Sequence, residues 1–398
     1  MVQYSSNFGG STISGEMIAH AMLEEGWELD IVFGFEGPFV QRMSGPKCRT
    51  HVSAHGNWLR HPGLFRFLRN LRREQTAVRQ MVGLFRNIKP DLVYVNSLVS
   101  YAGARAANQL GVPVVWHIRE LFSDRKGELH WPVAWAKPYI RRVIRSYAAN
   151  IVMNSNSVRH NVFGRNTVRN IEVIRNAVPR SFFQPHSQEL TVPGYPGLNI
   201  RGPIVGFPGT LRPVKGHRVF LAAIGSILEA VPNSHFVITG AVKSEFAVAL
   251  VNEVEAGPHR ERVHFVGEVR DMRDFYRAAD VCCIASESES FGRTAIETFA
   301  CRTPLVSTNS GGLADIVDHE VNCLVTEFGN ANQLARAVVR LLTDPQLSRR
   351  LTSAGYDKAV KYFGDQACSS AIIRVVRNSL QEKSGTVSRN KSNSVLRS

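Results

Sequence analysis

The sequence has no long apolar run and no regular cysteine spacing, and we expect no secretory leader from its first residues; each absence argues against a class of protein. Its apolar runs stay short of the roughly 20 residues that a membrane-spanning helix needs. The six cysteines form no CxxC motif and no Cys/His spacing, which favours reduced, mostly buried thiols over disulfides or metal ligands. The first ten residues are polar and glycine-rich instead of basic and then apolar, so we expect a cytoplasmic protein.

The composition is that of a globular protein large enough for two domains. The 398 residues are 44% hydrophobic and 20% charged, which excludes a mostly disordered or collagen-like chain. The net charge of +15 is unevenly distributed: residues 1–180 carry 24 basic and 12 acidic side chains, whereas residues 181–382 carry 20 and 21. The basic first half predicts an anionic partner, namely a membrane, a phosphorylated substrate or a nucleic acid.

Short apolar strands alternate with amphipathic segments along both halves, which predicts an α/β protein with two doubly wound, Rossmann-like domains. In the first half we expect strands at Val2–Ser5, Leu29–Phe33, Asp91–Val95, Val112–His117, Ile151–Asn154 and Ile171–Ile174. In the second half we expect them at Ile204–Phe207, His235–Thr239, Val263–Val266, Val281–Ala285, Pro304–Ser307 and Cys323–Val325. The helices expected between them include Ser14–Gly26, Ala102–Leu110, Val219–Ala230, Met272–Ala279 and Thr294–Ala300.

The expected domain boundaries follow from composition. The first domain spans residues 1–183, a linker rich in proline and glycine spans 184–203, and the second domain spans 204–365. A last helix at 366–382 packs back toward the first domain, and a basic tail at 383–398 is disordered. Ligands of such sheets bind beyond the carboxyl ends of the strands, so we expect the site in a cleft between the domains.

The most informative segment follows the expected strand Val281–Ala285. Glu289 lies in the loop after this strand, and Glu297 lies eight residues later, inside the helix into which the loop opens. Two such carboxylates can accept hydrogen bonds from paired sugar hydroxyls. An anionic or hydroxyl-rich ligand is also favoured by the peptide amides at the start of the helix, which belong to Phe291, Gly292 and Arg293.

Residues 286–325 resemble the C-terminal signature of glycosyltransferase family 4. The pattern is Glu289-x7-Glu297, followed by the Thr-Pro-Leu-Val of residues 303–306 and the Gly-Gly-Leu-Ala-Asp-Ile-Val of residues 311–317. Residues 209–216 resemble the family's phosphate-binding loop, residues 173–178 its pre-linker segment, and Gly9-Gly10 its N-terminal glycine loop. The resemblance covers about residues 5–363.

This resemblance implies a GT-B fold, in which two Rossmann-like domains face each other across a cleft. It implies a retaining hexosyltransferase that moves a sugar from a nucleotide-diphosphate donor to a hydroxyl acceptor. The acceptor class it suggests is a glycan or a lipid-linked molecule in polysaccharide or glycolipid biosynthesis.

The resemblance also implies how the departing diphosphate is held. Negative charge builds on the phosphate as the glycosidic bond breaks, and fixed donors must stabilise this charge. Lys215 is the leading candidate for this role. The family normally pairs the lysine with an arginine where this chain has Thr210, and Arg212 stands two residues on as a substitute. The backbone amides of Gly9 and Gly10 would add donors from the first domain.

The other site residues come from the same resemblance. Glu297 would hold the ribose hydroxyls of the donor, and Glu289 would hold the donor sugar with the amides at the helix start. His117, at the end of a strand, would face the reacting sugar, so the predicted catalytic residues are His117, Lys215 and Glu289. Asn96 and Glu120 are the acceptor-side candidates.

No metal cofactor is expected. The sequence has no clear Asp-x-Asp motif of the kind that chelates a metal–diphosphate complex, and Asp271 and Asp274 have the wrong spacing for one. We therefore expect lysine, arginine and peptide amides to neutralise the leaving group in place of a divalent ion.

Two basic stretches, Asn57–Lys89 and Trp131–Tyr147, carry apolar and aromatic residues at helical spacing. Such helices lie on anionic bilayers, which would make the protein peripheral on the inner face of the cytoplasmic membrane. An ordinary surface helix with its apolar face in the core has the same pattern, and both interpretations stay open.

Several other functions compete with the transferase. Thr210 and Ala177 depart from the family pattern and motivate an inactive, sugar-nucleotide-binding homologue. A GT-B epimerase would convert a nucleotide sugar without an acceptor. A glycoside hydrolase would use the two glutamates as acid and nucleophile, but a phosphate leaving group needs no strong acid. The basic half motivates a nucleic-acid-binding protein, yet the chain has no module signature of that class, so we expect no nucleic-acid partner.

Overall fold

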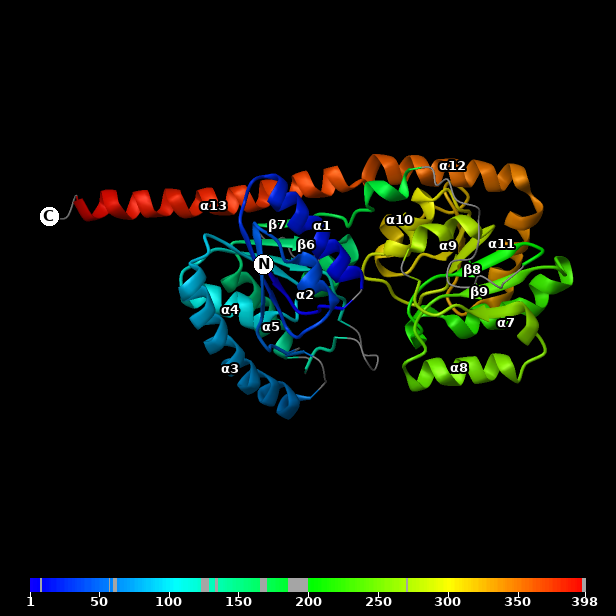
Figure 1. Ribbon diagram of the computed structural model, residues 1–398, viewed down its shortest axis with the longest axis horizontal. Helices are drawn as coiled ribbons and strands as arrows, with labels where there is room; N and C mark the ends of the chain where they lie inside the picture. Colours follow the sequence, from blue (N-terminus) through cyan, green and yellow to red (C-terminus); the bar gives the residue numbers. More distant parts are fainter. Residues whose placement is uncertain are drawn as a thin grey trace. The chain divides into compact units, whose positions relative to one another are not determined.

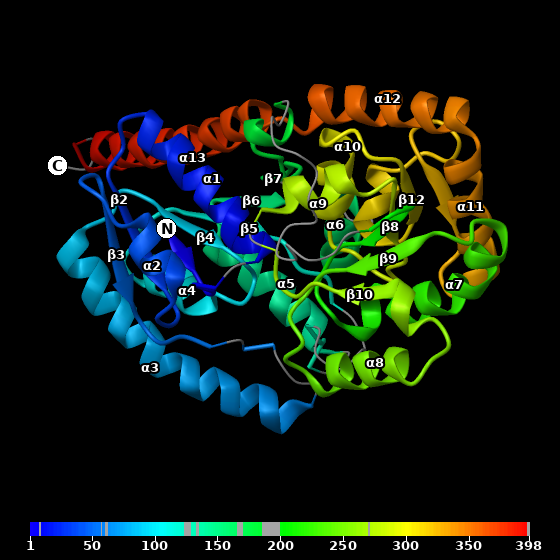
Figure 2. The ribbon, with the colours of Figure 1, turned by 45° about the vertical axis from the view of Figure 1, so that its right-hand side comes forward.

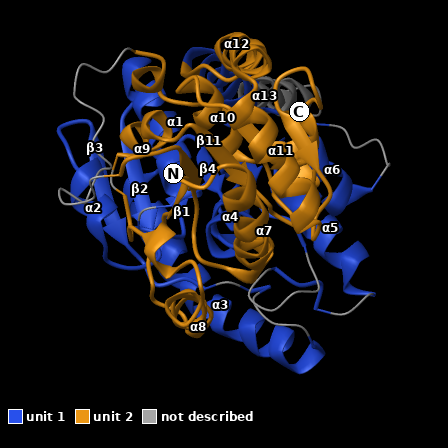
Figure 3. Ribbon diagram, turned by 90° about the vertical axis from the view of Figure 1, so that its right-hand side faces the viewer, with its two compact units in different colours: residues 1–176, 366–398 blue, residues 177–365 orange. Residues whose placement is uncertain are grey.

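The computed structural model describes residues 1–7, 9–56, 58–59, 63–122, 129–132, 135–164, 170–184, 200–269 and 271–395, with side chains up to residue 381. Strands and helices alternate along the chain (Figure 1). They form two compact α/β units (Figure 3). Unit 1 is Met1–Asn176 with Gln366–Ser398, and unit 2 is Ala177–Asp365.

Unit 1 contains a seven-stranded parallel sheet with the strand order β3-β2-β1-β4-β5-β6-β7. The order reverses between β1 and β4, and such a reversal is where ligands bind in open α/β sheets. The strands are β1 (Val2–Gln3), β2 (Leu29–Phe33), β3 (Cys48–Val52), β4 (Val93–Asn96), β5 (Val114–Ile118), β6 (Asn150–Met153) and β7 (Ile171–Val173).

Helices cover both faces of this sheet because side chains of a strand alternate between its two faces. One face packs under α3 (Leu64–Ile88), α4 (Tyr101–Gln109), α5 (Ala136–Tyr147) and α6 (Asn156–Phe163). The other face packs under α1 (Gly10–Glu24), α2 (Pro38–Met43) and the first half of α13 (Asp365–Val395). Trp116 faces the first layer, and its neighbour Val115 faces the second.

Unit 2 repeats this plan with six parallel strands in the order β10-β9-β8-β11-β12-β13. They are β8 (Ile204–Phe207), β9 (His235–Ile238), β10 (Val263–Phe265), β11 (Val281–Ile284), β12 (Leu305–Thr308) and β13 (Leu324–Thr326). The order reverses between β8 and β11. This second reversal point is where the functional motifs of the second half are expected.

The helices of unit 2 also lie in two layers, with α9 and α10 above the strands and α8 below them in Figure 2. The lower layer contains α7 (His217–Ala230), α8 (Glu245–Glu255) and α11 (Ala331–Thr343). The upper layer contains α9 (Met272–Ala278) and α10 (Arg293–Ala300), while α12 (Pro345–Tyr362) contributes to both. Four short 3-10 helices complete the described elements: η1 (Arg180–Phe182), η2 (Pro213–Lys215), η3 (Arg260–Arg262) and η4 (Gly311–Asp315).

The largest differences between the structure and the expected elements are at three places. Strand β3 was not expected, because Arg49, Thr50 and His51 interrupt its apolar pattern. Helix α1 begins at Gly10, four residues before the expected start. Helix α13 continues past residue 382 to Val395, in a segment that has no proline to stop a helix, and the expected disorder of residues 383–398 stays a prediction.

The two units divide at Asn176 and Ala177, before the expected boundary at residue 183. Val178 belongs to unit 2 because its amide donates to the carbonyl of Phe363 over 2.8 Å. Of the expected linker, residues 185–199 lie outside the described residues. Within the described part of the chain, no helix is long and apolar enough to cross a membrane.

Candidate active site

Two loops of unit 2 meet at the reversal point between β8 and β11, where they carry a close ion pair. Lys215 ends η2 after β8, and Glu289 lies in the loop between β11 and α10. Lys215 Nζ lies 2.6 Å from Glu289 Oε1. The two side chains are only 23% and 14% exposed. The fold thus brings together two predicted catalytic residues that are 74 positions apart in the chain.

Hydroxyl groups from three loop positions hold the Glu289 loop. Ser286 Oγ donates to Glu289 Oε1 over 2.7 Å. The carbonyl oxygen of Ser286 in turn accepts 2.6 Å hydrogen bonds from the hydroxyls of Thr308 and Ser310, at the end of β12. The carboxylate of Glu289 is therefore fixed before any ligand arrives, which is the condition for electrostatic preorganisation.

Glycine is required at two positions where these loops touch. Gly216 has a φ of 77°, and a Cβ there would lie 2.0 Å from the carbonyl oxygen of Ala285. Gly311 has a φ of 61°, and a Cβ there would lie 2.2 Å from the carbonyl oxygen of Glu289. The same carbonyl accepts a 2.7 Å hydrogen bond from the amide of Gly312. The glycine motifs thus allow the loops around Lys215 and Glu289 to approach one another.

The carboxylate of Glu297 lies within α10 and contacts two side chains. Arg293 Nε donates to its Oε1 over 2.5 Å, and the Tyr276 hydroxyl donates to its Oε2 over 2.8 Å. Burial, followed by the charge of Glu297, raises the pKa of Tyr276, so this phenol remains a hydrogen-bond donor. Each carboxylate oxygen has a second lone pair, which leaves Glu297 able to accept further hydrogen bonds.

The other donor-side residues surround this group. Phe291 is buried and packs its ring against Phe363 at 6.0 Å between centroids. Gly292 is the N-cap of α10 with a φ of 105°. Arg212 is half-buried before η2, and its carbonyl accepts a 3.0 Å hydrogen bond from the amide of Lys215.

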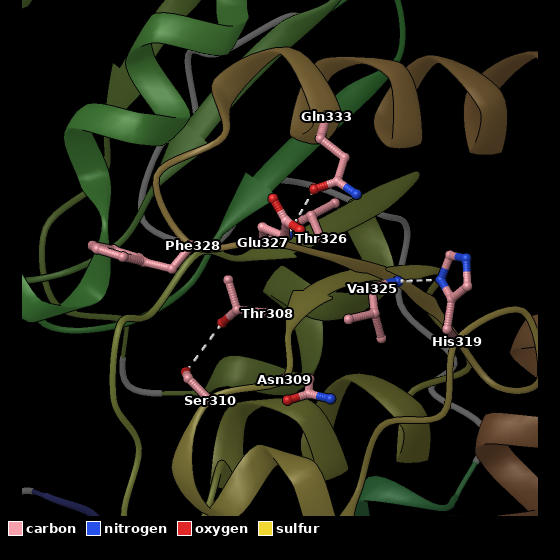
Figure 4. Close-up of a pocket in the computed structure, with 9 residues that line it drawn as sticks. All are labelled: Thr308, Asn309, Ser310, His319, Val325, Thr326, Glu327, Phe328 and Gln333. Carbon is pink, nitrogen blue, oxygen red and sulfur yellow. Dashed lines mark hydrogen bonds between the residues drawn. The ribbon is translucent and has the colours of Figure 1, made fainter.

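A hollow of about 540 Å³ lies beyond the carboxyl ends of β12 and β13 (Figure 4). Its walls are held by a 3.0 Å hydrogen bond from the Val325 amide to His319 Nδ1 and by a 2.7 Å hydrogen bond from the Glu327 amide to Gln333 Oε1. Ser310 borders both this hollow and the Glu289 loop. The lining residues are Thr308, Asn309, Ser310, His319, Val325, Thr326, Glu327, Phe328 and Gln333.

In unit 1, the predicted glycine loop lies after β1. Gly9 is the N-cap of α1, and its carbonyl accepts hydrogen bonds of 3.1 and 3.0 Å from the amides of Thr12 and Ile13. Gly9 and Gly10 are exposed, and no atom lies within 4 Å of a Cβ built on Gly9. The open space beside the helix start leaves room for an anionic ligand; that this loop supplies amide donors stays a prediction.

The predicted catalytic histidine lies on β5 of unit 1. His117 is 1% exposed, and its Nδ1 lies 2.5 Å from the hydroxyl of Tyr94 on the neighbouring strand β4. Burial, followed by the charge of Arg119, holds the pKa of His117 well below its ordinary value of 6.5. The imidazole is therefore neutral at physiological pH.

The two acceptor-side candidates lie at the ends of β4 and β5 and bind protein groups. Asn96 is fully buried; its Oδ1 accepts from Arg119 Nε over 2.6 Å. Glu120 Oε2 accepts 3.0 Å hydrogen bonds from the amides of Leu98 and Arg119. Glu120 Oε1 accepts from the hydroxyl of Ser97. The hydrogen bonds of both side chains stabilise the loops at this edge of the sheet, and their contact with an acceptor stays a prediction.

Sequence reasoning did not find three residues that touch the predicted site. Tyr276 lies in an expected helix, but a buried tyrosine there looks like any core aromatic residue. Tyr94 is hidden in the same way inside β4. Arg119 gave a usable signal, because a charged residue two positions after His117 breaks the apolar pattern at a strand end. No group of three potential metal ligands occurs among the residues that the structure describes.

Two family models match most of the chain between them. A model described as a glycosyl transferase 4-like domain matches residues 9–177, and one described as glycosyl transferases group 1 matches residues 196–358. A D-inositol 3-phosphate glycosyltransferase from Xylanimonas cellulosilytica is 34% identical over 185 residues, which are 45% of this chain and 43% of the relative. The lipopolysaccharide core biosynthesis mannosyltransferase LpcC of Rhizobium leguminosarum is 29% identical over 182 residues, 44% and 51% of the two chains. The matches therefore span about half the length of these relatives.

Solved structures resemble this chain over almost its whole length. HepE of Anabaena, solved in complex with UDP and glucose, has a TM-score of 0.78 and 20% identity over 94% of this chain and 98% of its own. Sucrose-phosphate synthase of Thermosynechococcus elongatus has a TM-score of 0.73 and 21% identity over 95% and 97% of the two chains. At such identity the likeness establishes the fold, and the predicted GT-B class with two Rossmann-like units is confirmed.

Proposed function

Because the chain belongs to the family 4 type of glycosyltransferases with the GT-B fold, we propose that it is a retaining hexosyltransferase with a nucleotide-diphosphate sugar as donor. In this reaction the bond between the sugar C1 and the phosphate oxygen breaks, and the nucleoside diphosphate leaves with the electron pair. The acceptor oxygen bonds to C1 and passes its proton to the departing phosphate oxygen. The observation that carries the proposal is the Lys215–Glu289 pair at the reversal point of unit 2.

The two members of this pair have different tasks in the proposed reaction. The ammonium of Lys215 stabilises the charge that builds on the departing diphosphate, a task that needs no metal ion. Glu289 accepts hydrogen bonds from hydroxyls of the donor sugar, and the amides of Phe291 and Gly292 donate to the same sugar. Because Lys215 already pairs with Glu289, its ammonium must be shared between the carboxylate and the diphosphate when the donor binds.

Glu297 binds the ribose of the donor in this proposal. Its carboxylate is held in one orientation by Arg293 and Tyr276, and its remaining lone pairs accept from the ribose hydroxyls. Arg212, just before η2, is a further donor to the diphosphate in this proposal.

Release of nucleoside diphosphate tests the proposal directly. Wild-type protein is incubated with UDP-glucose or GDP-mannose and a panel of glycan and lipid-linked acceptors, and the product is examined by proton NMR. We expect acceptor-dependent release of UDP or GDP and an axial, retained linkage at C1. Conversion of the nucleotide sugar without acceptor would identify an epimerase, and binding without turnover would identify an inactive homologue.

The acceptor is proposed to be a glycan or a lipid-linked molecule of the cell envelope. The similar mannosyltransferase LpcC acts in lipopolysaccharide core biosynthesis, as its name states. A membrane-borne acceptor would also account for the basic, aromatic surface of unit 1.

That surface lies where α3 and α5 begin. The amide of Gly63, just before α3, donates to the carbonyl of Pro132, just before α5, over 2.7 Å, so the two helix starts lie side by side. Around them large apolar side chains are exposed: Phe65 by 87%, Trp135 by 65%, Leu68 by 45% and Tyr139 by 45%. The inward faces of both helices pack in the core, so the sequence pattern reflects both a core face and an exposed one.

We propose that this surface rests on the anionic inner face of the cytoplasmic membrane. The apolar tips would enter the interface, and the exposed arginines would bind lipid phosphates; they are Arg66, Arg69, Arg72, Arg73 and Arg142. Sedimentation with phosphatidylglycerol vesicles at low and physiological salt tests this. We expect binding by the wild type and by Val360→Ser, which removes an exposed apolar side chain from unit 2, and loss of binding in Phe65→Ser/Trp135→Ser. Equal binding by all three proteins would contradict the proposal.

A further inference from the structure

Two hydrogen-bond donors converge on one ring nitrogen of His117. The Tyr94 hydroxyl lies 2.5 Å from His117 Nδ1, and Arg119 Nη2 lies 3.2 Å from the same atom. A guanidinium can only donate, so Nδ1 must present its lone pair to Arg119. Burial raises the pKa of Tyr94, so the phenol keeps the proton that it donates. The ring proton of the neutral imidazole is thereby assigned to Nε2.

The other ring nitrogen has no such contact. His117 Nε2 is buried and has no hydrogen-bond partner among the described residues. A buried N–H without a partner is unfavourable, and native proteins tolerate it mainly where a ligand or water supplies the acceptor. His117 lies near the carboxyl end of β5, the edge where ligands of parallel sheets bind.

Arg119 is itself held by groups from separate segments of unit 1. Its Nε donates to Asn96 Oδ1 over 2.6 Å, and its Nη1 donates to Asn176 Oδ1 over 2.5 Å. The amide nitrogen of Asn96 donates to the carbonyl of Ser11 over 3.1 Å, which fixes the orientation of Asn96. With 5% exposure, Arg119 has little freedom to turn away from the imidazole. The predicted acceptor-side residue Asn96 therefore acts on His117 through Arg119.

We propose that Tyr94 and Arg119 are positioning residues that lock His117 into the neutral Nε2–H tautomer, so that His117 donates a hydrogen bond to a sugar hydroxyl oxygen and does not act as a base. The inference rests on the proposed function for the identity of the ligand, and only on the contacts of unit 1 for the tautomer. It explains why a histidine and an arginine stand side by side at a buried strand end.

The charges around the ring support the same role. Arg119, directly after β5, is the cation that faces the imidazole, and Tyr94 on β4 is the titratable group on the opposite side. After burial, the thiol of Cys368 on α13 also raises the pKa of the Tyr94 phenol. Burial opposes protonation of Nδ1, and protonation would also place a second positive charge against Arg119. An imidazole in this setting is a poor proton acceptor at neutral pH.

Nitrogen NMR of the ligand-free wild type tests the tautomer without any substrate. The protein is labelled with ¹⁵N-histidine, and the His117 signals are identified by their loss in His117→Gln. We expect a two-bond proton–nitrogen pattern with Nε2 protonated and Nδ1 unprotonated, unchanged from pH 5.5 to 8. A proton on Nδ1, or titration of the ring within this range, would overturn the inference whether or not the protein proves to be a transferase.

Kinetics with UDP-glucose or GDP-mannose show whether His117 acts as a hydrogen-bond donor or as a general base. His117→Gln keeps an N–H near the place of Nε2, whereas His117→Leu has none. We expect His117→Gln to keep a turnover roughly ten- to a hundredfold above that of His117→Leu, with an unchanged pH profile. An equal loss of turnover in both variants would show that His117 is not needed as a hydrogen-bond donor.

Arg119 is tested by its effect on pH dependence. In Arg119→Met we expect the pKa of His117 to rise from its wild-type value, because burial alone then lowers it, and NMR and the acidic limb of the turnover profile would show this shift. Arg119→Lys keeps the charge and should restore the wild-type profile at least in part. A merely structural arginine would lower activity in both variants by a similar factor at every pH, and this result would also overturn the inference.

Discussion

Lys215 Nζ lies 2.6 Å from Glu289 Oε1, although the two residues follow different strands on either side of the reversal point of unit 2. An ammonium that already pairs with a carboxylate must share its charge when a diphosphate arrives. The pair therefore links binding of the nucleotide to the position of the side chain that would hold the sugar.

Glu289→Gln should separate these two tasks. Removing the carboxylate charge frees Lys215 for the phosphates, so we expect the affinity for UDP or GDP to stay equal or to rise by up to about tenfold. Turnover should fall by roughly a hundredfold, because the sugar loses its charged hydrogen-bond acceptor. Calorimetric titration and product release measure the two quantities. Loss of nucleotide affinity together with turnover would contradict the assignment.

Tyr276→Phe should weaken donor binding without changing the core volume much. The variant loses the 2.8 Å hydrogen bond that orients Glu297, so we expect KM for the nucleotide sugar to rise roughly three- to tenfold with a smaller change in kcat. Tyr101→Phe is the matched control, since Tyr101 is a fully buried tyrosine of unit 1. The role of Glu297 in ribose binding would be in doubt if both variants gave the same KM as the wild type.

Gly311→Ala should displace the Glu289 loop in addition to straining the backbone at residue 311. Gly329→Ala provides the comparison, because Gly329 also has a positive φ of 85° but no atom within 4 Å of its would-be Cβ. We expect Gly329→Ala to lower the free energy of unfolding by about 1 kcal/mol, which is the cost of the left-handed backbone conformation alone. Gly311→Ala should cost more and also abolish turnover, since its Cβ would meet the Glu289 carbonyl. Hydrogen exchange of unit 2 and activity assays check this, and equal effects would refute the packing argument.

Glu74 predicts a dependence of stability on pH. It is 3% exposed, accepts a 2.7 Å hydrogen bond from the Gly56 amide, and burial raises its pKa to about 7 from 4.5. A raised folded-state pKa stabilises the fold below pH 4.5, and this stability is lost as pH rises through 7. The contribution is roughly 3 kcal/mol.

We therefore expect the stability of Glu74→Gln relative to the wild type to increase between pH 4.5 and 8. Urea unfolding followed by tryptophan fluorescence measures this in unit 1, because all five tryptophans lie within residues 1–176. A constant difference between the two proteins over this range would show that the carboxyl is not protonated in the fold.

Much of this architecture could be predicted because local signals agree with it. Continuous apolar strands such as Val281–Ile284 are typical of a parallel sheet covered on both faces, and their order places the following loops at one edge. The positions of Lys215 and Glu289 on the two sides of the reversal point follow from that order. Their ion pair does not, because it depends on loop conformations that the glycine at 311 permits.

Other features depend on tertiary contacts that leave no local signal. Glu74 looks like a solvated charge in a basic helix, yet the fold buries it under Gly56. Strand β3 lies at the edge of the sheet, so Arg49 and Thr50 need no apolar pattern there. Arg119 becomes informative only when its amide partners, far apart in sequence, are seen around it.

Thermal denaturation with UDP, GDP and ADP tests the central claim, that unit 2 holds a nucleoside diphosphate between Lys215 and Glu297. Because a ligand of the folded state raises the melting temperature, at least one of the three should stabilise the wild type. The shift should vanish in Lys215→Ala and Glu297→Ala. It should persist in Lys358→Ala, which removes a lysine of similar exposure from a 2.7 Å ion pair with Asp318 elsewhere in the same unit. A full shift in both site variants would contradict the account.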